Sequence, residues 1–106
     1  RVLFRSFKNA VSVVTTTTSV LYTSTGESVL HGIFLANIIG TQVTGTVIFH
    51  DASSNTEHYI LFNSPILPGS TLVFDKPINL ETGDSIRLLA SDADSISAFA
   101  SILEIE

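Results

Sequence analysis

Hydrophobic and polar residues alternate in short runs along most of this chain. In one such run Val43, Val47 and Phe49 fall on one face of an extended strand, opposite Thr44 and His50. Such runs are separated about every ten residues by turn-forming residues, and the period of about 3.6 that marks a helix is missing. The pattern predicts an all-β fold, an antiparallel β-sandwich of jelly-roll or immunoglobulin-like type with about eight strands.

The strongest turn signal is Pro68-Gly69, which predicts a type II turn between two strands. Proline presets φ at the second turn position, and glycine accepts the positive φ of the third. Further turn signals fall at residues 24–26, 40–41, 51–55, 65, 82–84 and 92–94. On the strands between them, the alternation also assigns to the core Ile60, Phe62, Leu72, Phe74, Ile86, Leu88 and Ala90.

Two segments, residues 29–39 and 96–105, are apolar on both faces. In the second segment Phe99, Leu103 and Ile105 oppose Ile96 and other apolar residues. A two-layer sandwich buries only one face of each sheet, so strands of this kind need a second cover. We therefore expect another protein subunit to lie on them.

The composition leads to the same expectation. Only 14% of the 106 residues are charged, compared with about 25% in an average domain. The chain has 12 Thr and 14 Ser instead, and it has no cysteine for disulfides or thiolate metal sites. Because the cores of protein interfaces are depleted in charge, part of the surface is expected to be covered by neighbours. No apolar run approaches the roughly 20 residues of a membrane span, so we expect a soluble protein and no membrane partner.

Charge is distributed unevenly along the chain. The first eight residues carry three cations and no acid, whereas all ten acids lie beyond them beside only Lys76 and Arg87. We therefore divide the chain into residues 1–18, an extended N-terminal arm or a first strand, and residues 19–106, the sandwich domain. The arm is expected to contact capsid or neighbouring subunits through Arg1, Arg5, Phe7, Lys8, Val13 and Val14. Nucleic acid is not an expected partner, because the acidic body would repel phosphates.

Few residues point to chemistry. His31, His50 and His58 lack the spacing of a metal motif, although a cluster of His50 and His58 with Asp51 and Glu57 at one end of the sandwich stays open. Residues 92–95 have the alternating acids of a calcium loop but not its remaining ligands. Nucleophile motifs and glycine-rich phosphate loops are also missing. We expect no catalytic residues, no metal and no cofactor, and hence no enzyme.

Two stretches of the chain carry a family resemblance. Residues 19–28, with the apolar run that leads to Asn37, form the first, and residues 67–70 with residues 78–86 form the second. From about residue 18 onward the chain resembles small β-sandwich virion proteins of tailed bacteriophages, which decorate capsids or occur in necks and tails. The resemblance implies a non-enzymatic, oligomeric particle component in the virion. It supplies no catalytic residues that could be transferred to this chain.

The leading hypothesis is thus a capsid decoration or cement protein, which binds the assembled shell and stabilises it by mass action. Its expected partners are the major capsid protein or another virion protein, and further copies of itself, with a trimer favoured. A neck or tail component is an alternative. A second alternative is a carbohydrate- or receptor-binding module that uses the loops at residues 51–55 and 92–95, although Tyr22 and Tyr59 are the only tyrosines and tryptophan is absent.

Overall fold

The computed structural model describes residues 5–105, which form nine β-strands and no α-helix. The strands are β1 (Arg5–Val14), β2 (Ser19–Thr23), β3 (Glu27–Asn37), β4 (Val43–Asp51), β5 (Thr56–Ile66), β6 (Thr71–Phe74), β7 (Ile78–Leu80), β8 (Ser85–Ala90) and β9 (Ile96–Ile105). Within the described residues, no helix is long and apolar enough to cross a membrane.

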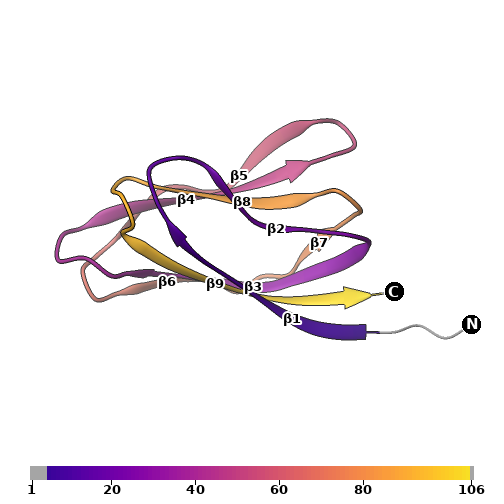
Figure 1. Ribbon diagram of the computed structural model, residues 1–106, viewed down its shortest axis with the longest axis horizontal. Coiled ribbons are helices and arrows are strands. Elements are labelled where there is room, and N and C mark those ends of the chain that lie inside the picture. Colours follow the sequence, from indigo (N-terminus) through magenta and orange to yellow (C-terminus); the bar gives the residue numbers. More distant parts are fainter. Residues whose placement is uncertain (1–4, 106) are drawn as a thin grey trace, which may run out of the picture.

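The strands form two antiparallel sheets that pack as two layers (Figure 1). The first sheet has the order β1-β9-β3-β6, and β7 also pairs with β3; the second has the order β2-β8-β4-β5. The chain crosses between the layers several times, as from β1 to β2 and from β8 to β9. The predicted all-β sandwich is confirmed.

The N-terminal segment is a strand of the sandwich over the residues that the structure describes. β1 pairs with β9 without a register shift, from Arg5 opposite Ile105 to Val14 opposite Ile96. The prediction of a free arm is therefore wrong for residues 5–14, and the alternative of a first strand is correct. The reason is that alternate residues of this segment face the core, ending in Val14, which is only 1% exposed.

The core lies between the two layers and is centred on β3 and β9. It contains Leu30, Ile33 and Leu35 from β3, with Ile96 and Ile102 from β9, all buried. They meet apolar side chains of the second sheet, which include the predicted core residues Val43, Val47, Ile86, Leu88 and Ala90. Burying side chains of this size contributes about 1.5–3 kcal/mol each relative to exposure, so this core supplies the main stabilisation of the fold.

One predicted core residue is wrong. Phe62 is 62% exposed and packs edge-on against Tyr59, with 4.8 Å between the ring centroids. The pairing of β4 with β5 shifts register twice, between Gly45 and Val47 and between Val47 and Ile48. Each β-bulge adds an unpaired residue and changes which face the following side chains occupy. Simple alternation therefore fails along β5.

The predicted turn at Pro68-Gly69 joins β5 to β6. Gly69 has a φ of 74°, and the N–H of Ser70 donates to the carbonyl of Leu67 at 3.0 Å. A positive φ at the third position is what a type II turn requires.

Asp84 ties together loops at one end of the sandwich. Its side chain is buried, and its two carboxylate oxygens accept the N–H groups of Ala52 at 3.0 Å and Glu81 at 2.9 Å. Its own carbonyl accepts the N–H of Ser24 at 2.8 Å. One carboxylate thus joins the β7–β8 turn to the β4–β5 loop, while the backbone carbonyl holds the β2–β3 loop.

We predict that Asp84→Asn lowers the free energy of unfolding by about 1.5–3 kcal/mol, because one oxygen becomes an NH₂ group that faces an N–H donor. Urea denaturation measures the change. The matched control is Asp94→Asn at an exposed position with a φ of 50°, a conformation that asparagine tolerates. Equal stability of the two variants would show that the Asp84 contacts do not hold this end together.

Candidate assembly surface

The outer face of the first sheet, which points away from the core, carries apolar side chains across all its strands. The central row runs across four strands. Phe99 of β9 pairs with Val11 of β1 on one side and with Phe34 of β3 on the other. Phe34 in turn pairs with Val73 of β6. A parallel row contains Phe7, Leu103, Val29 and Asn79. We call the outward residues of β1, β9, β3, β6 and β7 the outer face.

The outer face is open to solvent in the single chain. Phe7 is 80% exposed, Val11 is 70% exposed and Phe34 is 39% exposed. The Phe34 ring stacks on Phe99 at 5.9 Å, so neighbouring strands supply only lateral contacts. The structure shows that β3 and β9 place apolar residues on both faces and that the chain covers only one of these faces. The outward side also carries Glu27 of β3 and Ser97 and Ser101 of β9, and the row of Asn9 and Ser101 separates the two apolar rows. Exposed apolar patches of this kind mark interaction sites in soluble proteins.

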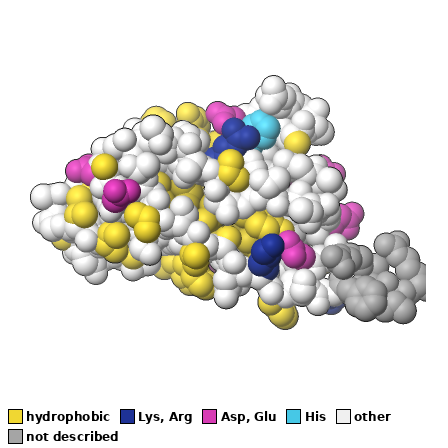
Figure 2. Space-filling model, in the orientation of Figure 1, with side chains coloured by type: hydrophobic (Ala, Val, Ile, Leu, Met, Phe, Trp, Pro, Cys, Tyr) yellow, Lys and Arg dark blue, Asp and Glu magenta, His cyan; other side chains and the backbone are white. Residues whose placement is uncertain are grey.

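β1 also leaves an unpaired strand edge beside this face. It is ten residues long, and within the described residues it pairs only with β9. The other four edge strands are short or interrupted: β6 has four residues, β7 has three, β2 has five and a register shift, and β5 has two shifts and Pro65. Short strands, bulges, prolines and charged side chains are the usual means by which proteins prevent edge-to-edge pairing, and of these β1 has only the charges of Arg5 and Lys8 near its start. Figure 2 shows hydrophobic side chains reaching the surface along the lower margin of the view, where Figure 1 places the strands of the first sheet.

The structure separates the predicted interface residues into two groups. Arg5, Phe7 and Val13 point outward and are exposed. Val14 is in the core of its own chain, so its prediction as an interface residue is wrong: it follows Val13, and adjacent strand residues point to opposite faces. Arg1 lies outside the described residues. The prediction missed Val11, which lies an even number of residues from both Phe7 and Val13 and could have been assigned to the same face by that spacing.

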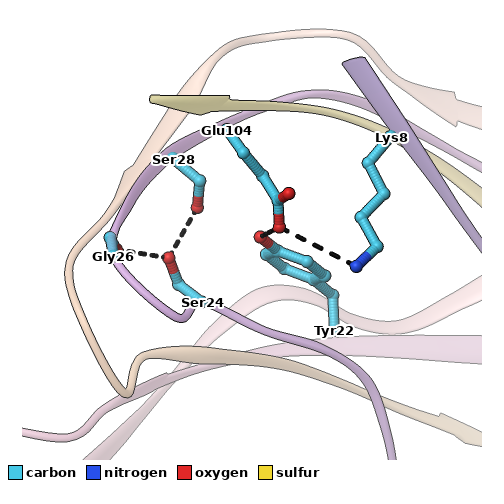
Figure 3. A network of polar contacts seen from close by, with 6 residues as sticks. All are labelled: Lys8, Tyr22, Ser24, Gly26, Ser28 and Glu104. Atoms are coloured by element: carbon cyan, nitrogen blue, oxygen red, sulfur yellow. Dashed lines mark hydrogen bonds and ion pairs between the residues drawn. The ribbon is translucent and has the colours of Figure 1, made fainter. Parts of the chain in front are cut away.

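Lys8 points inward and joins a polar network between the layers (Figure 3). Its ammonium is 3.9 Å from Glu104 of β9 and 5.9 Å from the ring centre of Tyr22 of β2. The Tyr22 hydroxyl donates to Glu104 at 2.5 Å. In the same region the Ser24 hydroxyl lies 2.7 Å from that of Ser28. Lys8, predicted to contact a partner, therefore has its charge matched within its own chain.

Burial of Tyr22, together with its hydrogen bond to Glu104, raises the pKa of its hydroxyl above the ordinary value of 10.0. Burial is the larger cause, since it disfavours the charged phenolate. The Lys8 ion pair adds little stability because the lysine side chain is 55% exposed and water screens the attraction. Tyr22 is thus the part of the network that connects the sheets most firmly.

The histidines do not form a metal centre. His50 Nε2 lies 3.0 Å from Asn55 Oδ1, and His58 Nε2 lies 3.1 Å from Thr56 Oγ1. Over residues 5–105 no group of three or more His, Cys, Asp or Glu side chains could hold a metal ion. Asp51 instead accepts from the Ser53 hydroxyl at 2.8 Å, and this hydrogen bond is the main cause that lowers the pKa of the Asp51 carboxyl.

The two loops of the predicted carbohydrate site do not lie together. His50 pairs with Ser85 at one end of the β4–β8 ladder, and Gly45 pairs with Ala90 at the other. The loop at residues 51–55 follows the first end, and the loop at residues 92–95 follows the second. A single site built from both loops is therefore ruled out by the antiparallel pairing of β4 with β8.

The described hollows are small. One of about 260 Å³ lies at the end of the outer face beside Glu27, Val29, Asn79 and Ile105, with Ser28, Leu80 and Glu81 completing its lining. Another of about 140 Å³ lies beside Tyr22 and Glu104. Both are smaller than the roughly 300–1,000 Å³ of typical small-molecule sites.

Comparison with known proteins gives a likeness of fold. No family model matches the chain, and no curated protein matches it. Among solved structures, it is similar to a chain from Bacillus endospore appendages, which form a novel family of disulfide-linked pili. The TM-score is 0.58 at 15% sequence identity, covering 95% of this chain and 85% of the appendage chain. At this identity the likeness shows the β fold alone.

We predict that the free energy of unfolding falls as pH rises above about 10, because the unfolded chain loses the Tyr22 proton before the folded chain does. The fall continues until the pH passes the raised pKa of folded Tyr22, with a slope of at most about 1.4 kcal/mol per pH unit. Urea denaturation from pH 8 to 11 measures it. Tyr22→Phe should flatten the profile, whereas the control Tyr59→Phe, at a position 59% exposed, should keep it. Identical slopes in wild type and Tyr22→Phe would contradict the assignment.

Proposed function

We propose that this chain is a non-enzymatic structural subunit that assembles with copies of itself through β1 and the outer face. The observation that carries the proposal is the ten-residue, uninterrupted edge of β1 beside two apolar rows of the outer face, between which lies a polar row with Asn9 and Ser101. An exposed edge supplies backbone N–H and C=O groups to an added strand, and the apolar side chains beside it supply the hydrophobic contribution.

The first form of this assembly is a filament or array. Pairing of β1 with one of the shorter or interrupted edges of the next copy, over the regular residues of that edge, is a head-to-tail contact, which repeats without limit unless the rotation closes a ring. Pairing of β1 with β1 would instead be a two-fold contact and would close as a dimer. The likeness in fold to a subunit of endospore appendages supports this form. The 106 residues contain no cysteine, so contacts among these residues would be non-covalent.

The second form is the decoration of a shell, as the resemblance to virion proteins of tailed bacteriophages implies. In this form copies of the chain form a closed oligomer, such as a trimer, and bind the major capsid protein or a neck or tail protein. Many weak contacts repeated by symmetry would then stabilise the particle, because each bound copy raises the effective concentration at the next contact.

Sedimentation velocity and negative-stain electron microscopy over a wide protein concentration range separate the two forms. A filament subunit grows in mass as concentration rises, whereas a decoration protein stops at a fixed small oligomer. We expect the chain to form more than a monomer at micromolar concentration. A compact monomer at high micromolar concentration, with no particles in the microscope, would contradict self-assembly.

We predict that proline in β1 blocks edge pairing. Adjacent residues of a strand direct their N–H groups to opposite sides of the strand. Of the variants Asn9→Pro and Ala10→Pro, one therefore removes a hydrogen bond to β9, whereas the other removes only an N–H donor on the free edge. The variant that retains wild-type stability should lose assembly by sedimentation. If it assembles like the wild type, β1 is not the edge that pairs.

A further inference from the structure

We infer that two copies pack outer face to outer face, related by a two-fold axis that runs along β9. This inference rests on the proposed function and identifies the occupant of the outer face as a second copy. The rotation places β1 of one copy over β3 of the other and leaves β9 over β9. Because it preserves position along the strands, each row of the outer face meets the same row of the partner.

The charges of the outer face match in this arrangement. Arg5 and Glu27 lie in the same end row, because each pairs with Ile105 from opposite sides of β9. The rotation therefore places Arg5 of each copy over Glu27 of the other. Two ion pairs form at one end of the interface, and no like charges meet.

The sizes of the side chains match as well. Val11 lies over Phe34 of the partner, and Phe7 lies over Val29, so a large side chain faces a small one between β1 and β3. On the axis itself, Phe99 meets Phe99 and Leu103 meets Leu103 of the partner. The hollow of about 260 Å³ beside Val29, Asn79 and Ile105 lies where the exposed Phe7 ring of the second copy would enter. Interdigitation of this kind is how the facing sides of two sheets fill the space between them.

The other two-fold arrangement is less favourable. An axis across the strands would reverse the order of the rows in the partner and place Arg5 over Val13 of the second copy. Glu27 of the second copy would then lie at the other end of the interface, away from Arg5. Both charges would then lose water without gaining a partner. The observed order of charged and apolar rows thus favours the axis along β9.

The area fits a weak contact. Only β1, β9 and β3 overlap in this arrangement, so strands about 4.8 Å apart with a rise of about 3.4 Å per residue give a face of roughly 14 by 30 Å, or about 430 Å² per copy. Two copies bury about 860 Å², which is the size of a weak or transient interface. The edge of β1 stays free at the side of this pair, so face packing and edge pairing are separate contacts.

Charge reversal tests the ion pairs by sedimentation equilibrium. We predict that Arg5→Glu or Glu27→Arg alone raises the dissociation constant of the face-to-face dimer by about tenfold, since each places like charges together. The double variant with both changes should restore it, because the exchanged charges again meet between copies. If the double variant remains as weak as the single ones, the arrangement is wrong. Lys76→Glu, outside the outer face, is the control and should leave the constant unchanged.

A cysteine at Ser97 tests the axis itself. Ser97 is exposed at the end of β9, and the axis along β9 brings it opposite Ser97 of the second copy, whereas the axis across the strands brings it opposite Ile105. Because the chain has no other cysteine, a short bismaleimide should convert Ser97→Cys to a covalent dimer. The control Ser54→Cys, in the exposed β4–β5 loop, should remain a monomer on denaturing gels.

The outcomes distinguish this inference from the proposed function. If Ser97→Cys gives no covalent dimer while the wild type still assembles and the tolerated β1 proline variant does not, copies pair through the edge and face-to-face packing is wrong. If the wild type forms no assembly at any concentration, both proposals are wrong. A covalent Ser97→Cys dimer together with rescue by double charge reversal establishes the face-to-face pair.

Discussion

The regular ten-residue pairing of β1 with β9 is the interaction on which the other surface features depend. It aligns Val11 with Phe99 and, through β9, with Phe34, so apolar side chains from distant parts of the sequence form one continuous row. It also makes β1 the last strand of its sheet, which leaves backbone groups without a partner strand. The same pairing therefore creates both the apolar face and the open edge.

The inward side of β1 explains why the outer face carries so little charge. Because adjacent strand residues point to opposite faces, Lys8 points toward the second sheet, where its ammonium lies near Glu104 and the Tyr22 ring. A lysine on the outward side would have prevented close packing of another sheet. The network joins the first sheet to β2 at this end, and Asp84 joins the loops, so the edge of β1 extends from a rigid support.

The sequence was sufficient to predict the fold class and the doubly apolar strands, because both depend on local alternation. It was insufficient for β5, where two β-bulges placed Phe62 in solvent, since a bulge depends on pairing with β4 and leaves no mark in the alternation of β5 itself. Val14 was misassigned for a related reason: a neighbouring pair of valines does not reveal which one faces inward. The alignment of Arg5 with Glu27 depends on the register of three strands and required the structure.

Face packing and edge pairing have different consequences for the size of an assembly. A two-fold contact uses the same surface on both copies and closes on itself, so it can produce only pairs. Edge pairing between different strands leaves a free β1 after every addition and can continue.

A chain that used both face packing and edge pairing would form a ribbon two sandwiches thick, in which each added pair makes two edge contacts at once. The second contact costs little further entropy after the first has formed, so a ribbon would be stable even where a single edge contact is weak. These residues contain no cysteine that could link neighbouring copies covalently. Two edge contacts for each added pair are therefore the physical means by which these residues could hold a long assembly together.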